Sequence, residues 1–144
     1  MKISIVFPIH NEYDNLKILL NEWNTGLNKL SNFSYEFVLV EDGSTDGTKD
    51  LIKELENYYP ILNLSSERKR GYTKAVLDGI NSSNGEYILC TDSDNQIKVE
   101  SLIQNIKNLP QDNSFLIGYR NPRKDSLNRI LYSKLFKIFH NFLF

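Results

Sequence analysis

Residues 37–48 read FVLVEDGSTDGT, an apolar run followed at once by a turn rich in Gly, Ser, Thr and Asp. Four consecutive apolar residues are typical of a strand that is buried on both faces, as in a parallel sheet. The turn residues favour helix capping, and Leu51, Ile52 and Leu55 follow at helical spacing. The segment therefore predicts a strand, a tight turn and a helix, which together form the building unit of an α/β fold.

The same alternation extends in both directions along the chain. Pro8 is expected to end the first strand, and Pro110 to close the fourth helix. Cys90 falls within an apolar run and is interpreted as a small core residue of a buried strand. Alternating strands and helices predict a doubly wound, mainly parallel sheet flanked by helices. The further strands are expected at 3–8, 61–64, 87–90 and 115–117, and the further helices at 16–30, 75–80, 102–109 and from about 126 onward.

Composition limits the classes of protein to which the chain can belong. It has 144 residues, a formal net charge of -1 and one Cys. The length predicts one domain with its own core, and a single Cys excludes a disulfide framework or a cysteine-based zinc site. A near-neutral charge gives no electrostatic reason to expect nucleic-acid binding. Without a signal peptide or an apolar run of ~18 residues, we expect a cytoplasmic, soluble-type domain.

Polar clusters follow three of the predicted strands. They are residues 8–12, Glu41-Asp42, and Asp92-Ser93-Asp94. In a doubly wound sheet, ligands bind outside the carboxyl ends of the strands, so these clusters are expected to share one ligand-binding edge. His10 is interpreted as a turn or pocket-wall residue there, because two His without ligand spacing do not make a zinc site.

Asp92 and Asp94 are the candidate ligands of a divalent cation. Alternate residues of an extended segment point the same way, so both carboxylates can face one ligand. Mg²⁺ and Mn²⁺ prefer oxygen ligands, often one or two carboxylates together with substrate phosphates. Gln96 could supply a third oxygen or orient a water. The alternative is an Asp-rich turn without a ligand, and the position after an apolar strand favours the metal site.

Two further segments are candidate nucleotide contacts. Asp42 could accept hydrogen bonds from a base, whereas residues 44–46 are interpreted as turn and helix-cap residues. Arg68, Lys69 and Arg70 precede Gly71 and a predicted helix start, which suits phosphate binding. Arg70, next to the glycine, is the better candidate, and a solvated basic turn is the alternative for the other two. No G-x-S-x-G, P-loop or G-x-G-x-x-G motif supports a hydrolase, a P-loop kinase or a dehydrogenase.

Taken together, these motifs resemble family 2 glycosyltransferases with the GT-A fold, a Rossmann-like doubly wound fold. The opening IVFPIHNE is similar to that family's (V/I)-P-x-(Y/H)-N-E, and VEDGSTDGT is similar to its V-D-D-G-S-x-D-G-T. The resemblance implies an inverting transfer from a nucleotide sugar, with Mg²⁺ or Mn²⁺ held by Asp92 and Asp94 as the catalytic carboxylates. The resemblance implies that Pro8, Glu12 and Asp42 line the nucleotide pocket and that Asp92 lies at the donor diphosphate. Arg70, from its place before Gly71, is added as a further contact of the nucleotide sugar, which is expected to be a UDP- or GDP-sugar.

A narrower resemblance concerns the acceptor. Asp92-Ser93-Asp94-Asn95-Gln96 is similar to the D-A-D-x-Q of polyprenyl-phosphate mannosyl- and glucosyltransferases. Arg120, Arg129 and Ser133 resemble the residues that hold the acceptor phosphate in that group. The implied acceptor is a dolichyl or undecaprenyl phosphate at the cytoplasmic face of a membrane. The alternatives are a saccharide hydroxyl acceptor in polysaccharide synthesis, or a nucleotide-binding module without turnover.

The tail has its own charge and apolar pattern. Residues 118–144 hold six Lys and Arg against one acidic residue, whereas residues 1–117 hold 11 against 17. A basic amphipathic helix suits a membrane interface, and packing of its apolar stripe on the sheet is the alternative. We therefore expect a donor-binding core over 1–118 and an acceptor and membrane segment over 119–144. Because relatives continue further, a fragment is expected, and a bared apolar face in it would favour self-association.

Two positions depart from the family pattern. Glu41 occupies the first Asp position of the usual Asp-Asp pair, and Lys69 stands where many relatives have Asn. Neither change affects the expected metal ligands.

Overall fold

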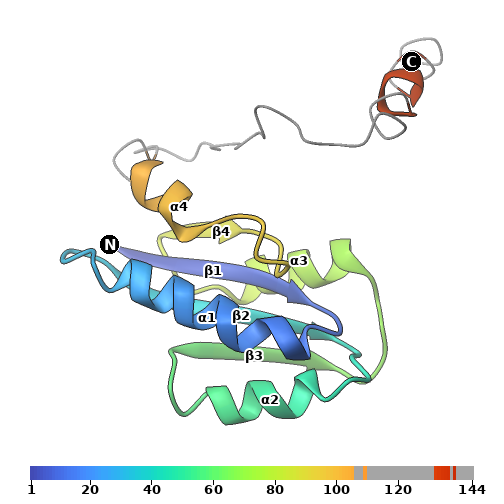
Figure 1. Ribbon diagram of the computed structural model, residues 1–144, viewed down its shortest axis with the longest axis horizontal. Coiled ribbons are helices and arrows are strands. Elements are labelled where there is room, and N and C mark those ends of the chain that lie inside the picture. The colour runs from blue at the N-terminus through green and yellow to red at the C-terminus, as the bar shows by residue number, and fades with distance from the viewer. Residues whose placement is uncertain (106–108, 110–131, 137, 139–144) are drawn as a thin grey trace. The chain divides into compact units, whose positions relative to one another are not determined.

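The structure is a computed structural model that describes residues 1–105, 109, 132–136 and 138. It divides into two units, Met1–Asn108 and Leu109–Phe144, each of which is described by itself. All strands and the four long helices of the described part belong to the first unit (Figure 1). In chain order they are β1 (Lys2–Ile9), α1 (Tyr13–Leu27), β2 (Ser34–Asp42), α2 (Thr48–Leu55), β3 (Ile61–Ser66), α3 (Tyr72–Ser82), β4 (Tyr87–Cys90) and α4 (Val99–Asn105).

The strands form a four-stranded sheet in the order β3-β2-β1-β4, and every pairing is parallel. Strand β1 lies between β2 and β4, with Val6 opposite Val38 on one side and Cys90 on the other. Each strand is joined to the next by a helix, as the hydrophobic pattern predicts. The predicted α/β class and the mainly parallel sheet are therefore confirmed.

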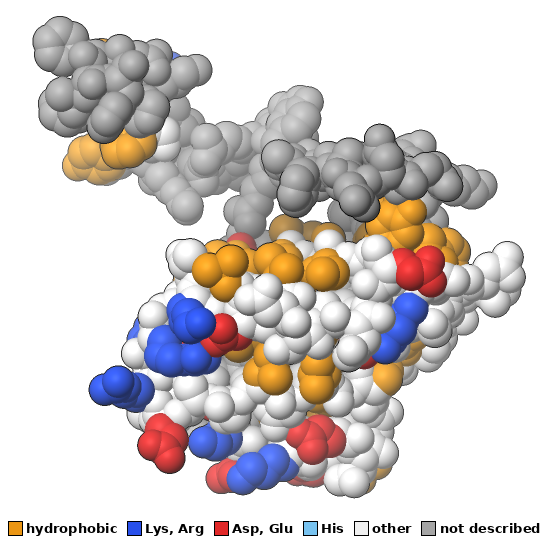
Figure 2. All heavy atoms as spheres, turned by 180° about the vertical axis from the view of Figure 1, so that it is seen from behind, with side chains coloured by type: hydrophobic (Ala, Val, Ile, Leu, Met, Phe, Trp, Pro, Cys, Tyr) orange, Lys and Arg blue, Asp and Glu red, His pale blue; other side chains and the backbone are white. Residues whose placement is uncertain are grey.

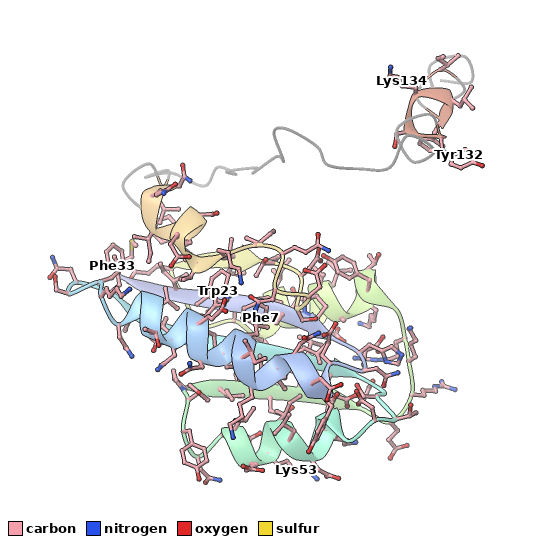
Figure 3. All side chains as sticks on the ribbon, in the orientation of Figure 1. Phe7, Trp23, Phe33, Lys53, Tyr132 and Lys134 are labelled. Carbon is pink, nitrogen blue, oxygen red and sulfur yellow. The ribbon has the colours of Figure 1, made fainter. Side chains whose placement is uncertain are left out.

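The central strands bury different side chains on their two faces. Phe7 of β1 packs edge-on against Trp23 of α1, with ring centroids 5.4 Å apart (Figure 3). Phe7 also contacts Phe37 of β2, with a centroid distance of 6.1 Å, and all three rings are buried. On the other face, Val6, Val38 and Val40 form a buried cluster with Ala75 of α3. Burial on both faces explains the continuous apolar run of β2.

Helix α3 approaches the sheet closely because Gly79 carries no side chain. A Cβ atom at this position would lie 2.4 Å from Cγ1 of Val6 and 3.0 Å from Cγ2 of Val40. Both valines belong to the central strands, and β-branched side chains have little freedom to move aside. Gly79 and the small, buried Ala75 therefore let α3 pack closely against β1 and β2.

Replacing Gly79 by Ala should destabilise the protein by about 1 kcal/mol, because the cost of overpacking exceeds the gain in helix propensity of about 1 kcal/mol. Urea unfolding of the variant and the wild type measures the difference. Asn81→Ala, an exposed position in the same helix, is the matched control and should change stability by less than about 0.5 kcal/mol. A Gly79→Ala protein as stable as this control would contradict the close packing.

The first strand runs further than expected. Pro8 was predicted to end it, but β1 continues to Ile9, and Pro8 lies opposite Val40 of β2. The carbonyl groups of Val6 and Pro8 accept hydrogen bonds from the β4 side, where strand pairing already ends at Val6. The N–H that proline lacks would point to the same side. Pro8 therefore stays in the strand without removing a ladder hydrogen bond.

The prediction of a buried strand at 87–90 is wrong in part. Ile88 and Cys90 of β4 are exposed, and Tyr87 and Leu89 are half-buried. Within the described residues β4 pairs with β1 alone, so it is the edge strand of the sheet, and the interpretation of Cys90 as a core residue is not supported. Figure 2 looks at the face that carries α3 and shows apolar side chains at its surface; the exposed ones on α3 and β4 include Tyr72, Leu77, Ile80 and Ile88.

Several helix ends also differ, and some expectations fall outside the described residues. Helix α1 ends at Leu27, so Leu30 lies beyond it, and Leu109 is not helical. The expected strand 115–117 and Pro110 lie outside the described residues. In the second unit, residues 132–136 are helical, and Leu135 and Phe136 are exposed. Among the residues that the structure describes, no helix is long and apolar enough to cross a membrane.

Candidate functional site at the carboxyl edge of the sheet

The order of the strands brings the three polar clusters to one edge of the sheet. Because β2, β1 and β4 are neighbours and parallel, the residues that follow Asp42, Ile9 and Cys90 leave the sheet at the same edge. A hydrogen bond of 3.0 Å from Oγ of Ser93 to the carbonyl oxygen of Pro8 joins the end of β1 to the Asp92-Ser93-Asp94 segment. The expected shared edge is therefore present.

Asp42 is buried and holds the turn that precedes α3. Its carboxylate accepts hydrogen bonds from the backbone N–H groups of Arg70 and Gly71, both at 2.8 Å. Burial alone would raise the pKa of Asp42, but these N–H groups, the Ser66 hydroxyl and the Arg70 guanidinium together outweigh it and lower the pKa. Asp42 is thus a charged carboxylate at neutral pH, next to the candidate phosphate-binding turn.

Gly43 explains how this turn comes so close to the end of β2. Its φ is +66°, and a Cβ atom would lie 2.5 Å from the backbone carbonyl carbon of Arg68 and from the N atom of Lys69. Only glycine combines that backbone conformation with such a close approach. The Asp-Gly pair therefore lets the 68–71 backbone lie directly over the strand end.

Arg70 is paired with two carboxylates. Its Nη1 lies 2.8 Å from Oδ2 of Asp78 on α3, and its Nε lies 3.7 Å from Oδ1 of Asp42. The side chain is 34% exposed, so it can still meet a ligand. Arg68 and Lys69 are exposed, which agrees with a solvated turn.

Replacing Asp42 by Asn should destabilise the protein by about 2 kcal/mol at pH 7, because one N–H group loses its charged acceptor and meets an amide donor instead. Because the pKa of Asp42 is lower in the folded state, its ionisation stabilises the folded protein at pH values above 3.8, the usual pKa of Asp. That contribution is lost as the pH falls through the folded-state pKa. The difference in the free energy of unfolding between wild type and variant should therefore be constant above about pH 5 and should narrow as the pH falls below 3.8. Urea unfolding across this range measures it, with the exposed Asp14→Asn as control, and a gap that does not change with pH would contradict the assignment.

The turns after β1 and β2 are tied together by short polar contacts. The backbone N–H of Asn11 donates to Oγ of Ser44 at 3.0 Å, and Oδ1 of Asn11 accepts from the N–H of Thr45 at 2.9 Å. Asp46 accepts from the N–H of Thr48 at the start of α2 and from the N–H of Tyr13 at the start of α1. The interpretation of residues 44–46 as turn and cap residues is confirmed.

His10 and Glu12 belong to the same turn. Nδ1 of His10 lies 2.9 Å from the carbonyl oxygen of Asp42, which fits its interpretation as a turn residue. Glu12 precedes α1, its N–H donates to Oγ1 of Thr48, and its half-buried carboxylate accepts a hydrogen bond from Nδ2 of Asn15. Glu12 therefore lies after the carboxyl end of β1, beside the start of α2.

The candidate metal ligands each have one carboxylate oxygen in a hydrogen bond. Oδ1 of Asp92 accepts from the Tyr72 hydroxyl at 3.0 Å, and Oδ1 of exposed Asp94 accepts from the N–H of Gln96 at 3.0 Å. The described residues contain no cluster of three His, Cys, Asp or Glu that could hold a metal alone. Each carboxylate has a second oxygen that accepts no hydrogen bond from the described residues, and such a pair fits Mg²⁺ or Mn²⁺, which commonly complete their coordination with substrate phosphates and water.

The acceptor candidates cannot be placed against this edge. Arg120 and Arg129 lie outside the described residues, and Ser133 is exposed in the helical residues 132–136 of the second unit.

Sequence reasoning missed two neighbours of the candidate site residues. Tyr72, which binds Asp92, follows Gly71 directly and could have been found as the first residue of the expected helix. Asp78, the partner of Arg70, lies four residues after Lys74, with which it also forms an ion pair. Glu41, which departs from the usual Asp, is fully buried and accepts hydrogen bonds from the N–H of Ser44 and the hydroxyl of Ser65, so in this chain it holds the turn after β2 and the end of β3.

Comparison with known proteins identifies the family. The profile of Glycosyl transferase family 2 matches residues 4–143. Dolichol-phosphate mannosyltransferase of Pyrococcus furiosus is 30% identical over 120 residues, which cover 83% of this chain and 33% of that protein. Undecaprenyl-phosphate 4-deoxy-4-formamido-L-arabinose transferase of Photorhabdus laumondii is 32% identical over 138 residues, which cover 93% of this chain and 42% of that protein. The chain thus spans well under half the length of these relatives.

Solved structures agree on the fold. S. aureus TarS 1–349 in complex with UDP-GlcNAc aligns with a TM-score of 0.57 and 27% identity, over 74% of this chain and 30% of that one. Mannosyltransferase PcManGT from Pyrobaculum calidifontis, in complex with GDP-Man and Mn²⁺, aligns with a TM-score of 0.52 over 73% of this chain and 31% of that one. At 19% identity, PcManGT supports the fold alone. From the family profile, the relatives and the parallel sheet together, the chain belongs to glycosyl transferase family 2 and has the GT-A fold.

Proposed function

We propose that the protein is an inverting glycosyltransferase that moves a sugar from a UDP- or GDP-sugar to a polyprenyl phosphate. The observation that carries this proposal is the single sheet edge at which Glu12, Asp42 and the Asp92-Ser93-Asp94 segment meet. Two relatives are named for transfer involving dolichol phosphate and undecaprenyl phosphate, and a structural neighbour that is 27% identical was solved with UDP-GlcNAc.

The nucleotide is proposed to bind along the ends of β1 and β2. Pro8 and Glu12 would line the pocket, and Asp42 would accept an N–H of the base. Its Oδ2 accepts one hydrogen bond from the described residues, donated by the N–H of Gly71, and a carboxylate oxygen has room for a second. Arg70 would meet the negative charge of the diphosphate while Asp78 holds its guanidinium.

The diphosphate end is assigned to Asp92, Asp94 and Gln96. The two carboxylates would hold Mg²⁺ or Mn²⁺, and the Gln96 side chain, which belongs to an exposed residue, would contribute an oxygen or orient a water. When bound, the cation neutralises the charge that grows on the leaving nucleoside diphosphate. The residues themselves fix the diphosphate at the edge where the sugar is transferred.

Transfer of the sugar to the acceptor phosphate needs no general base from the protein. An oxygen of the acceptor phosphate forms a bond to the anomeric carbon, and the bond from that carbon to the diphosphate breaks. A phosphate monoester, with a second pKa near ~6, is largely ionised at neutral pH, so no proton has to be removed from it. Arg120, Arg129 and Ser133 are proposed to hold this phosphate.

The place of action is proposed to be the cytoplasmic face of a membrane, with the basic segment 119–144 as a peripheral contact. Cations there suit anionic headgroups as well as the acceptor phosphate. The division into a donor-binding core at 1–118 and this segment, and self-association of the chain, remain predictions.

Thermal unfolding with nucleotides tests the donor half of the proposal. UDP or GDP at ~100 times its dissociation constant should stabilise the folded protein by about 2.7 kcal/mol in the presence of Mn²⁺, and the same nucleotide concentration should stabilise it less in EDTA. CDP and dTDP serve as comparison nucleotides. A cooperatively folded protein that none of the four nucleotides stabilises would count against a donor site in this chain.

Arg129→Ala tests the acceptor half. Transfer to a polyprenyl phosphate should fall selectively, while Mn²⁺-dependent nucleotide binding stays the same. Unchanged transfer to the lipid phosphate, or transfer to a saccharide hydroxyl instead, would refute the assignment.

A further inference from the structure

The start of α3 connects two strand ends of the proposed donor site. The backbone N–H groups of Arg70 and Gly71 donate to Asp42 after β2, and the hydroxyl of the next residue, Tyr72, donates to Oδ1 of Asp92 after β4. Tyr72 is the first residue of α3, so its backbone is fixed by the helix and by the turn that Asp42 holds. The Tyr72 side chain that contacts Asp92 therefore extends from a backbone whose position is fixed.

Asp92 needs such a partner to keep one orientation. Its neighbour Ser93 is buried, and the Ser93 hydroxyl holds the chain to the carbonyl oxygen of Pro8. Asp92 itself is only half-buried, and Tyr72 provides the one side-chain hydrogen bond to its carboxylate that the structure specifies. A carboxylate oxygen that accepts one hydrogen bond leaves the second oxygen available to a ligand.

We propose that Tyr72 is a positioning residue, whose hydroxyl orients the Asp92 carboxylate toward a divalent cation and the donor diphosphate. This inference rests on the proposed donor site. Carboxylates that ligate metals are themselves hydrogen-bonded, and such outer partners contribute to metal affinity. Tyr72 is 59% exposed, so it adds little to the core, and its hydrogen bond to Asp92 is the contact through which it would affect ligand binding.

Tyr72→Phe removes this hydroxyl and keeps the ring. Calorimetric titration of the whole chain with UDP and with GDP, each with Mn²⁺ and again with EDTA, separates metal-dependent from metal-free binding. The variant should lose about tenfold in Mn²⁺-dependent affinity, at the low end of the effect of such partners because Asp92 is partly exposed. Binding in EDTA and the unfolding temperature without ligand should stay the same.

The matched control is Tyr58→Phe, which removes a hydroxyl from a ring that is 72% exposed beyond α2. It should bind like the wild type in every titration. Asp92→Asn gives a second test, because Tyr72→Phe should cause no further loss in that background if the hydroxyl acts through the carboxylate.

The outcomes are distinct. A loss restricted to the titrations with Mn²⁺, and absent in the Asp92→Asn background, supports the assignment. A Tyr72→Phe protein that binds like the wild type, or that loses as much in EDTA as in Mn²⁺, overturns it and leaves the proposed donor site standing. A wild-type chain with no Mn²⁺-dependent nucleotide binding overturns the proposed function and this inference together.

Discussion

Replacing Asp94 by Asn should lower the Mn²⁺-dependent affinity for UDP or GDP by at least about 100-fold, and Asp92→Asn should have an effect of the same order. This loss is larger than the 10–100-fold cost of losing an outer partner of a metal ligand, because the substitution removes the charge of a proposed ligand itself. Titration with each nucleotide in Mn²⁺, compared with the same titration in EDTA, measures the effect.

Folding should be almost unchanged in both variants. Asn keeps an oxygen that can accept the hydrogen bond from Tyr72 at position 92, or from the N–H of Gln96 at position 94. Neither carboxylate is buried. The substitutions therefore remove negative charge with little change in packing, and lost binding can be assigned to the metal and diphosphate instead of to unfolding.

Asp50→Asn is the matched control, because it removes the same charge from a side chain on α2 that is 84% exposed. Its ion pair with Lys53 is a surface contact of small energy. If Asp94→Asn and Asp50→Asn bind the nucleotides equally well in Mn²⁺, the carboxylates after β4 are an Asp-rich turn without a metal.

The fold was predictable because its signals are local. An apolar run such as 37–40 needs cover on both faces, and a turn such as 41–47 leads into a helix, so the parallel sheet follows from short segments. The burial of residues in the edge strand β4 could not be predicted from such local signals. The exposure of Cys90 depends on what lies beyond β4, and four residues of apolar sequence do not contain that information.

The place of the candidate site residues in the fold was predictable from the sequence, but their hydrogen-bond partners were not. Asp42 and Asp92 were identified from where they follow strands, and the parallel order of the sheet placed them at one edge. Their hydrogen-bond partners come from the start of α3, up to 29 residues from Asp42 in sequence and 20 from Asp92. No sequence spacing predicts such contacts. The hydrogen bond from Tyr72 to Asp92 and the ion pair of Arg70 with Asp78 could therefore be found only in the structure.

Glu36 is the residue whose importance the sequence hides most fully. It stands just before the apolar run of β2, where a charged residue is expected at a solvated strand end. In the structure its side chain is only 12% exposed. Its carboxylate accepts hydrogen bonds from Nζ of Lys2 and Oγ of Ser4, both at 2.6 Å, and from the backbone N–H of Asn84 at 2.8 Å. Glu36 thus joins β1, β2 and the α3–β4 turn at the amino edge of the sheet, opposite the proposed site.

Glu36→Ala should therefore destabilise the protein by about 3 kcal/mol, the lower end of the cost of breaking a buried ion pair, since Lys2 is partly exposed. The substitution leaves the Ser4 hydroxyl and the Asn84 N–H without their acceptor. The cost of these unsatisfied donors adds to the loss of the ion pair with Lys2. Urea unfolding at pH 7 measures this loss of stability. The control is Glu54→Ala, at an exposed position of α2, which should destabilise the protein by less than about 0.5 kcal/mol.

The pH dependence gives an independent check on Glu36. Burial acts to raise its pKa, but the hydrogen bonds from Lys2, Ser4 and Asn84 outweigh it and lower the pKa below the usual 4.5. A lowered pKa stabilises the folded protein above pH 4.5, and this contribution disappears as the pH falls through the folded-state value. The wild type should therefore lose its advantage over Glu36→Ala in acid, and nucleotide binding by the folded variant at pH 7 should be unchanged, because the contacts of Glu36 lie at the other edge of the sheet. A variant as stable as the wild type at pH 7 would show that Lys2, Ser4 and Asn84 do not depend on this carboxylate.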